Sequence, residues 1–377
     1  MHSLIRGSHA PRCLGLIIAA AGLAGSAFAQ TQVTPTPPDY PRGKISGYIF
    51  GDYYDNLVGN PTHYYTSAGA DTGKTNIDNN STSKQLGKDL NGIQIRRVDF
   101  QLDNDLSVKY STRLRLEIDG KSLTSDGKIG ANVKAAYVLA KSLVPRGDFY
   151  LGMLPTPTYE TAEDFWQYRS IEKTIADFRG IGTAADFGVE LKGAIDPDHH
   201  FGYSAMIGNG AGQKPEDNRY KKFYLALPAK VGDIRLEPYV DYENASAAHD
   251  RATYKLFAGY DHRLGAIGVE LLDRVNHIPG AANQNPRGYS IFVRTAPRPT
   301  FGAFARFDAW NPDRRLVNRV DSQLWMLGVD WQPIKDVHFM PNVEATQFQA
   351  QGTAVAPPHH ELQARLTVYY RFSRPQS

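Results

Sequence analysis

The sequence is almost free of cysteine: Cys13 is the only one among 377 residues. It lies in an N-terminal segment where Arg6 and Arg12 precede an apolar run that ends in Ala-Phe-Ala at 27–29. This order is typical of a cleaved secretory signal peptide, which we place at residues 1–29, with an uncleaved anchor as the alternative. The exported chain therefore has no thiol for a disulfide, for thiolate catalysis or for a zinc-thiolate site.

Net charge and long apolar runs are also scarce. The formal charge of +3 falls to about +1 once Arg6 and Arg12 are removed, which argues against a nucleic-acid binder with a basic surface. No later stretch of about 18 apolar residues exists, and the mean hydropathy is −0.42. A helical membrane protein is thereby excluded. A β-barrel is not, because only every second residue of a barrel strand faces lipid.

Signatures of the common enzyme classes are missing as well. The sequence has no Gly-x-Ser-x-Gly elbow, no glycine-rich phosphate loop and no dinucleotide-binding fingerprint. We therefore predict no catalytic residue, no cofactor and no enzymatic activity. A barrel hydrolase whose serine, histidine and acid meet only in space stays open as an alternative.

What the sequence does have is alternation of apolar and polar residues with period two. In residues 110–119, Leu114, Leu116 and Ile118 share one face, and the other face carries arginines and carboxylates. The pattern recurs at 97–102, 234–242, 325–331 and 362–372. Segments of about ten residues with this alternation are what a membrane barrel requires of its strands.

The connections between these segments alternate in length. Long ones lie at 56–90, 120–129, 158–183, 208–219, 244–251, 275–287, 310–321 and 349–359, and short turns near 104–107, 142–147, 196–199, 229–232, 262–265, 297–299 and 333–336. This asymmetry favours an outer-membrane barrel over a soluble β-sandwich. The fold class predicted is all-β: a transmembrane antiparallel β-barrel of about 16 strands, within two either way, with an aqueous interior.

The ends of the barrel are set by composition and by the last strand. Residues 30–43 are rich in proline and are predicted to be a periplasmic lead-in, so the barrel spans 44–372. The last strand ends in Phe372, which resembles the terminal aromatic signal of outer-membrane barrel assembly. Five residues follow it, and we predict that 373–377 form a short C-terminal tail.

Six segments occur in a characteristic order. They are GIQIRRVDFQLDN at 92–104, YSTRLRLEID at 110–119, FYLGMLPTP at 149–157, YRSIEKTIADFRGIGTAADFGVELKG at 168–193, FARFDAWNPD at 304–313 and HFMPNVE at 338–344. Together they resemble the phosphate-selective porin (O and P type) family of Gram-negative outer-membrane porins. The resemblance covers about 44–372 and implies a sixteen-stranded trimeric porin with one loop folded into the lumen. Basic residues here are interleaved with carboxylates such as Asp99 and Asp241, so phosphate selectivity is not carried over.

Alternation also predicts which charged residues face the interior. The pore-lining candidates are Arg97, Arg113, Arg115, Glu117, Arg235, Arg294, Arg306 and Arg365. As a set, the arginines could lower the barrier for anions. The alternative is that each pairs with a neighbouring carboxylate and holds the register between strands.

The segment 158–183 is too long for a hairpin turn and mixes aromatic with charged residues. An inward-folded constriction loop needs such a mixture, because it must be buried against the wall and present charge to the pore. The constriction-loop candidates are Trp166, Tyr168, Arg169, Lys173 and Arg179. A surface loop is the alternative.

Two further features concern Arg96 and two pairs of histidines. Arg96 falls on the lipid-facing parity of its strand, so we expect it near the membrane interface. The histidine pairs at 199–200 and 359–360 suggest metal binding, but successive strand residues point to opposite faces and no nearby carboxylate completes an obvious site. We therefore predict no metal site.

These patterns predict passive diffusion of small hydrophilic solutes through a Gram-negative outer-membrane porin, with modest anion preference. The predicted partners are outer-membrane lipid and lipopolysaccharide, the barrel-assembly machinery, small anionic or neutral solutes and two further copies in a homotrimer, with no nucleic acid. The alternatives are a barrel enzyme of lipase or protease type and a closed structural or adhesin barrel. The long polar loop at 56–90 would be the binding surface of such an adhesin.

Overall fold

The computed structural model describes residues 39–60, 86–120, 124, 128–245, 249–296, 300–353 and 358–376. It contains seventeen labelled strands and two short helices. Their bounds are β1 Arg42–Val58, β2 Asn91–Asp105, β3 Tyr110–Asp119, β4 Asn132–Val144, β5 Gly147–Pro155, α1 Glu160–Trp166, α2 Ile175–Phe178, β6 Ala185–Ala194, β7 Gly202–Gly208, β8 Lys222–Ala226, β9 Ala229–Val231, β10 Ile234–Glu243, β11 Arg251–His262, β12 Gly265–Asn276, β13 Arg287–Thr295, β14 Phe301–Asn311, β15 Arg319–Ile334, β16 Val337–Gln351 and β17 Glu361–Gln376.

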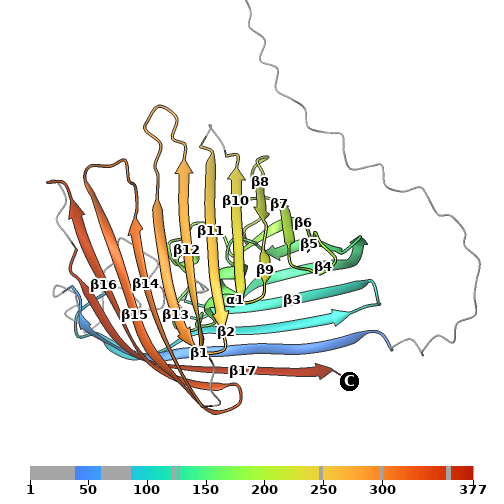
Figure 1. Cartoon of the computed structure of the whole chain (residues 1–377), viewed down its shortest axis with the longest axis horizontal. Coiled ribbons are helices and arrows are strands. Elements are labelled where there is room, and N and C mark those ends of the chain that lie inside the picture. Colours follow the sequence, from blue (N-terminus) through green and yellow to red (C-terminus); the bar gives the residue numbers. More distant parts are fainter. Residues whose placement is uncertain are drawn as a thin grey trace, which may run out of the picture. The chain divides into compact units, whose positions relative to one another are not determined.

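The strands form one closed antiparallel sheet. Apart from the step from β8 to β9, each strand pairs with the next along the chain. β17 returns to pair with β1, so the first and last strands lie side by side (Figure 1). β8 and β9 pair with successive parts of β10 and are separated only by Leu227 and Pro228. Proline has no N–H to donate to the ladder, which accounts for the break. β8 and β9 therefore count as one barrel strand, and the barrel has sixteen, as predicted.

Long and short connections alternate around the barrel. Two residues join β4 to β5, β11 to β12 and β15 to β16, whereas the chain between β5 and β6 runs through α1 and α2. The short turn predicted at 297–299 and most of the loop at 56–90 lie outside the described residues. In the described part of the chain, no helix is long and apolar enough to cross a membrane, which says nothing about strands.

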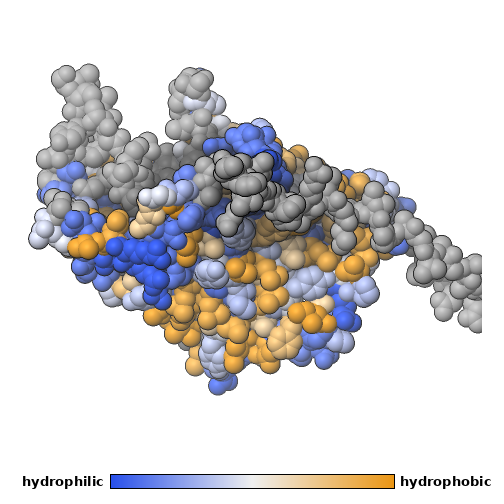
Figure 2. Space-filling model, turned by 90° about the horizontal axis from the view of Figure 1, so that it is seen from above, coloured by the Kyte–Doolittle hydropathy of each residue, from blue (hydrophilic) through white to orange (hydrophobic). Residues whose placement is uncertain are grey.

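Alternating residues of each strand are sorted between an outer apolar face and an inner face. On β15, Trp325, Leu327 and Val329 are exposed, whereas Leu324 and Met326 are buried. Figure 2 shows apolar side chains gathered over a broad part of the visible surface, bordered by hydrophilic ones. The apolar outer face is what contact with lipid requires.

The bounds of the barrel differ from the prediction at both ends. β1 already begins at Arg42, and β17 continues past Phe372 to Gln376, with Ser373 paired to Ser46. Residues 373–376 are therefore strand and not a tail. β1 is long enough to offer hydrogen-bonding partners to every one of them, which the sequence of β17 alone does not reveal. The predicted signal peptide at 1–29 lies outside the described residues.

Candidate functional site

The segment between β5 and β6 packs against the inner face of the wall. Phe165 and Trp166, at the end of α1, are almost fully buried. The Phe165 ring lies 5.3 Å from that of Phe257, and the Trp166 ring lies 5.0 Å from that of Phe292. These wall residues alternate with exposed outer-face residues on β11 and β13, so they point inward.

Glycine makes room for this contact. A Cβ atom added to Gly259 of β11 would lie 2.7 Å from the Phe165 ring, and one at Gly288 of β13 would lie 2.8 Å from Trp310 and 3.0 Å from Ile175. Such distances are too short for carbon atoms that do not share a bond. The loop can therefore approach the wall closely only because these two positions lack side chains.

Wall arginines hold the main chain of the loop. Arg294 donates from Nε to the carbonyl oxygen of Phe165 at 3.1 Å, and Arg306 donates to the carbonyl of Lys173. Arg96 donates to the carbonyls of Ser170 at 3.1 Å and Ile171 at 2.6 Å. Because these carbonyls accept no helical hydrogen bond, the arginines satisfy buried acceptors that a loop would otherwise leave unpaired.

The prediction that Arg96 faces lipid is wrong. Its side chain is only 10% exposed and forms ion pairs with Glu172 at 3.1 Å and with Asp52 at 3.4 Å. The register of β1 and β2 shifts at Phe50 and Gly51, so Arg96 is the extra residue of a β-bulge. A bulge breaks the alternation of faces, and both Arg96 and Arg97 therefore point inward.

The wall formed by β2, β3 and β4 is lined by ion pairs. Arg97 lies 2.7 Å from Glu117, and Lys134 lies 2.9 Å from the other oxygen of Glu117. Nearer the short-turn end, Arg115 pairs with Asp99 at 2.6 Å. These charges are diagonal neighbours on adjacent strands, so they hold the register of the wall and keep it wetted.

The loop has a charged edge of its own, formed by Glu163, Arg169, Lys173 and Asp177. Arg169 donates to Glu163 at 2.9 Å and to Asp177 at 3.1 Å. Burial alone would raise the pKa of Asp177, but Arg169 and Lys173, with Arg97 and Lys134 of the wall, outweigh it and bring the pKa to about 2. Burial raises the pKa of Glu163. Charges of the wall therefore help to keep the Asp177 carboxylate ionised.

The structure places all eight predicted pore-lining residues on the inner face. Arg97, Glu117, Arg294, Arg306 and Arg365 are buried, and Arg113, Arg115 and Arg235 are partly exposed. Six of the seven arginines have a carboxylate partner, namely Glu117, Asp103, Asp99, Asp261, Asp308 and Glu344. The alternative of local pairing therefore describes these six better than an unneutralised basic stripe does.

Arg235 differs from the other wall arginines. It stacks over the Phe165 ring at 5.6 Å, and its Nε is buried without a hydrogen-bond partner in the described part of the chain. Arg294 lies at the same distance from that ring. Phe165 is therefore held by two guanidinium groups as well as by aromatic contacts.

The five predicted loop residues divide into anchors and charges. Trp166 and Tyr168 are anchors, with the Tyr168 ring 4.2 Å from that of Phe304. Arg169 and Lys173 belong to the charged edge. Arg179 lies over the rings of Phe178 at 4.8 Å and Trp310 at 5.6 Å.

Arg179 is the basic residue of the loop that has no ion-pair partner among the described residues. Its Nε and Nη2 atoms are buried without a hydrogen-bond partner, and it forms no ion pair with any described residue. Burial lowers its pKa to about 10, so the side chain keeps its charge at neutral pH. An unpaired guanidinium in the interior attracts anions.

Sequence reasoning missed Lys134 and Arg96, both of which lie at register shifts. The shift between Arg115 and Leu116 places Lys134 beside Glu117. A pattern of period two has no means of locating a bulge, because the bulge shows only in the partner strand. Inward-facing Phe257, Phe292 and Phe304 did offer a signal, since aromatic residues on both faces of a strand indicate that something packs inside.

One histidine lies closer to carboxylates than expected. In the turn between β6 and β7, ligand atoms of Asp196, Asp198 and His200 lie within 4.8 Å of one another. The two carboxylates lie near this histidine because the turn folds the chain back on itself, and the absence of a metal site stays a prediction. Asp196 already accepts the backbone N–H groups of His200 and Phe201, so hydrogen bonds within the turn account for its position.

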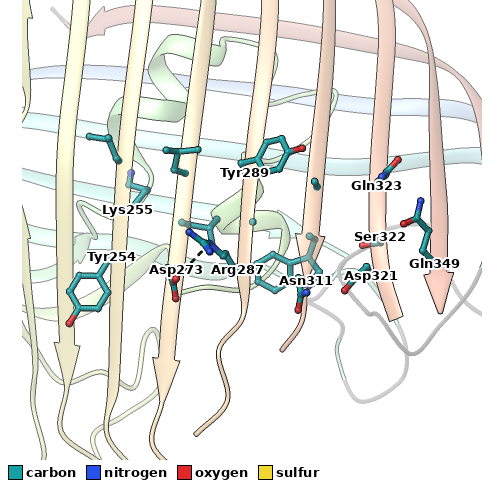
Figure 3. Close-up of a pocket in the computed structure, with 16 residues that line it drawn as sticks. Tyr254, Lys255, Asp273, Arg287, Tyr289, Asn311, Asp321, Ser322, Gln323 and Gln349 are labelled. Atoms are coloured by element: carbon teal, nitrogen blue, oxygen red, sulfur yellow. Dashed lines mark ion pairs between the residues drawn. The ribbon is translucent and has the colours of Figure 1, made fainter. Parts of the chain in front are cut away.

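A hollow of about 680 Å³ lies at the long-loop ends of β11 to β16, and its lining includes Gly288 and Trp310, which also lie close to the loop. Figure 3 shows Asp273 and Arg287 joined by an ion pair, with Asn311, Asp321 and Gln323 on the neighbouring strands. These positions share the parity of Leu271, Tyr289 and Trp325, which are exposed on the outer face. The hollow is thus lined mainly by residues of the outer face.

Comparison with known proteins gives similarity in structure and none in sequence: no family model and no curated protein matches the chain. The chain is similar in structure to the outer membrane channel DcaP of Acinetobacter baumannii, with a TM-score of 0.61, 12% identity and coverage of 88% of this chain and 97% of that one. It is similar to an anion-selective porin from Comamonas acidovorans, with a TM-score of 0.59, 12% identity and coverage of 88% and 100%. It is also similar to OmpT of Vibrio cholerae, with a TM-score of 0.58, 11% identity and coverage of 89% of this chain and 98% of that one. The fold is therefore that of Gram-negative outer-membrane porins, while membership of the phosphate-selective family stays a prediction.

Proposed function

We propose that this protein is an outer-membrane channel for passive diffusion of small hydrophilic solutes, with a modest preference for anions. The observation that carries the proposal is the closed sixteen-strand barrel with an apolar outer face, a charged inner face and one loop packed inside. Solutes pass between the charged edge of the loop and the wall of β2, β3 and β4. The porin fold of the structural neighbours supports this reading.

The anion preference rests on the charges that remain after pairing. Most interior arginines have a carboxylate partner, which removes most of their long-range field. Arg179 and Arg235 form no ion pair with a described residue. Carboxylates such as Glu163 and Asp177 still face the passage, so the preference is modest and does not amount to phosphate selection.

Conductance of single channels in planar bilayers tests the proposal. The refolded mature protein is expected to give steady conductance, and its reversal potential in a potassium chloride gradient is expected to indicate anion preference. Arg179→Gln should reduce that preference. Arg263→Gln is the matched control, because it removes the same charge from an exposed short turn. A folded barrel without conductance would contradict the channel function.

Conductance, ligand binding and hydrolysis assays together separate the alternatives. Absence of conductance together with ligand binding by the long loops would favour a structural or adhesin barrel. Hydrolysis of lipid or peptide by the pure protein would favour a barrel enzyme. We propose that the protein has no enzymatic activity, since the interior contacts described above are accounted for by packing and ion pairing.

The cellular setting forms part of the proposal. The chain is proposed to be exported, inserted by the barrel-assembly machinery and surrounded by outer-membrane lipid and lipopolysaccharide as a homotrimer. Membrane fractionation tests the location. Light scattering of the detergent-solubilised protein tests the trimer, for which a monomer mass would be the contrary result.

A further inference from the structure

A second part of the interior lies between the loop and the strands that close the barrel. This cavity has a volume of about 550 Å³ and is lined by the loop, β1 and β13 to β17, within the range of about 300–1,000 Å³ typical of small-molecule sites. Arg371, which lines it, donates to Asp336 in the short turn between β15 and β16. The cavity therefore lies on the short-turn side of the loop.

Aromatic side chains form a continuous row along this cavity. Tyr369 of β17 is the register partner of both His338 on β16 and Phe50 on β1. Its ring centroid lies 5.4 Å from that of His338, 6.5 Å from Phe50 and 5.9 Å from Tyr48. Tyr48 and Tyr369 line the cavity and are partly exposed, so part of each ring can contact a ring-shaped solute.

Polar groups surround the row at hydrogen-bonding positions. Asp330 lies 2.9 Å from the ring nitrogen of His338, and Gln332 follows on the same inner face of β15. The hydroxyl of Tyr48 accepts a hydrogen bond from Arg115 at 2.9 Å, which links the row to the charged wall. Carboxylate, amide and phenol groups beside an aromatic face suit a solute that has both an apolar face and hydroxyl groups.

Formal charge in the cavity is balanced. The acidic lining residues are Glu163, Asp164 and Asp330, and the arginines are Arg169, Arg294 and Arg371. Three negative and three positive side chains give no net attraction for an anion. This balance distinguishes the cavity from the surroundings of Arg179, where a guanidinium has no ion-pair partner among the described residues.

We infer that this cavity is a binding site for neutral, ring-shaped polyhydroxylated solutes, that is, small saccharides. The C–H face of a sugar ring packs on Tyr48 and Tyr369, while its hydroxyl groups donate to Asp330 and bind Gln332 and His338. Such a site concentrates the solute beside the passage without closing it. The inference rests on the channel function proposed above and names one class of solute for it.

The test is maltose-dependent interruption of single-channel potassium chloride current through the full mature barrel. Wild-type protein is expected to show interruptions by maltose and none by mannitol, an acyclic polyol without a ring. Tyr48→Ala combined with Tyr369→Ala is expected to raise the half-blocking maltose concentration about tenfold, since each ring contributes somewhat under 1 kcal/mol. Tyr369→Phe should retain most of the effect, because it keeps the ring.

The chain offers a matched control on the same two strands. Tyr53 and Tyr370 lie on the outer face of β1 and β17, exposed by 50% and 44%, so their double alanine variant should leave maltose block unchanged. A β-sheet circular-dichroism spectrum equal to that of wild type verifies that each variant is folded. Equal block by maltose and mannitol, block only by 4-hydroxybenzoate, or no block would overturn the saccharide site while leaving the channel intact. Absence of conductance in wild type would instead remove the channel function itself.

Discussion

Two sides of the barrel interior use arginine in different ways. On β13 and β14, Arg294 and Arg306 donate to main-chain carbonyls of the internal loop, beside an apolar surface that includes Phe292. On β2 and β3, Arg97 and Arg115 pair with carboxylates of the wall itself. Inward-facing arginines thus fasten the loop on one side of the barrel and line the passage on the other. Which role an arginine has depends on what its side chain faces.

The loop is expected to detach from the wall when its apolar contacts with β13 and β14 are removed. Trp166→Ala removes a fully buried indole that packs between Phe292 and Phe304. We expect a loss of about 3–5 kcal/mol of packing free energy, release of the loop and a severalfold rise in single-channel conductance. Phe307→Ala on the outer face of β14 is the control. Unchanged conductance in Trp166→Ala would show that the loop does not narrow the passage.

A smaller effect on loop attachment is expected from Arg96, a wall residue that contacts the loop. Arg96 belongs to β2 but binds the loop at Ser170, Ile171 and Glu172. Arg96→Gln should weaken loop attachment by about 1.5–3 kcal/mol and increase open-channel current noise with little change in selectivity.

Arg113→Gln provides the comparison for this variant. Arg113 is about one-third exposed and pairs with Asp103 on the wall alone, and pairs of that kind contribute about 0–1 kcal/mol. Equal noise in the two variants would contradict the distinction between fastening and lining arginines.

The smallest effect concerns the charged edge of the loop. Burial raises the pKa of Glu163, whereas Asp177 has a pKa of about 2 because the attraction of Arg169 and Lys173 outweighs its burial. A carboxyl with a raised pKa loses its negative charge at a higher pH, so anion preference should increase as the pH falls from neutral through the pKa of Glu163. Reversal potentials between about pH 8 and pH 4 measure this. Glu163→Gln should remove the pH dependence, and its persistence would assign the titration to another group.

Much of the wall could be predicted from the sequence, and the reason is local. The side chains of a strand alternate between two faces, so the parity of Arg113, Arg235 and Arg365 follows once one face is known to be apolar. Strand number follows from the alternation of long and short connections. Parity gives the direction of a side chain but not its partner. The sequence therefore did not reveal that six of the seven predicted arginines are neutralised by carboxylates among the described residues.

The sequence by itself thus indicated a closed barrel of about sixteen strands, its outer face and a candidate for the segment that packs inside. Only the tertiary structure decided that Arg96 and Lys134 turn inward, because a bulge depends on the register with a second strand. It also decided that Ser373 to Gln376 extend the last strand, because that requires a partner from the other end of the chain. The row from His338 through Tyr369 to Phe50 arises in the same way. Contacts between distant segments depend on pairing geometry, which periodicity within one strand does not encode.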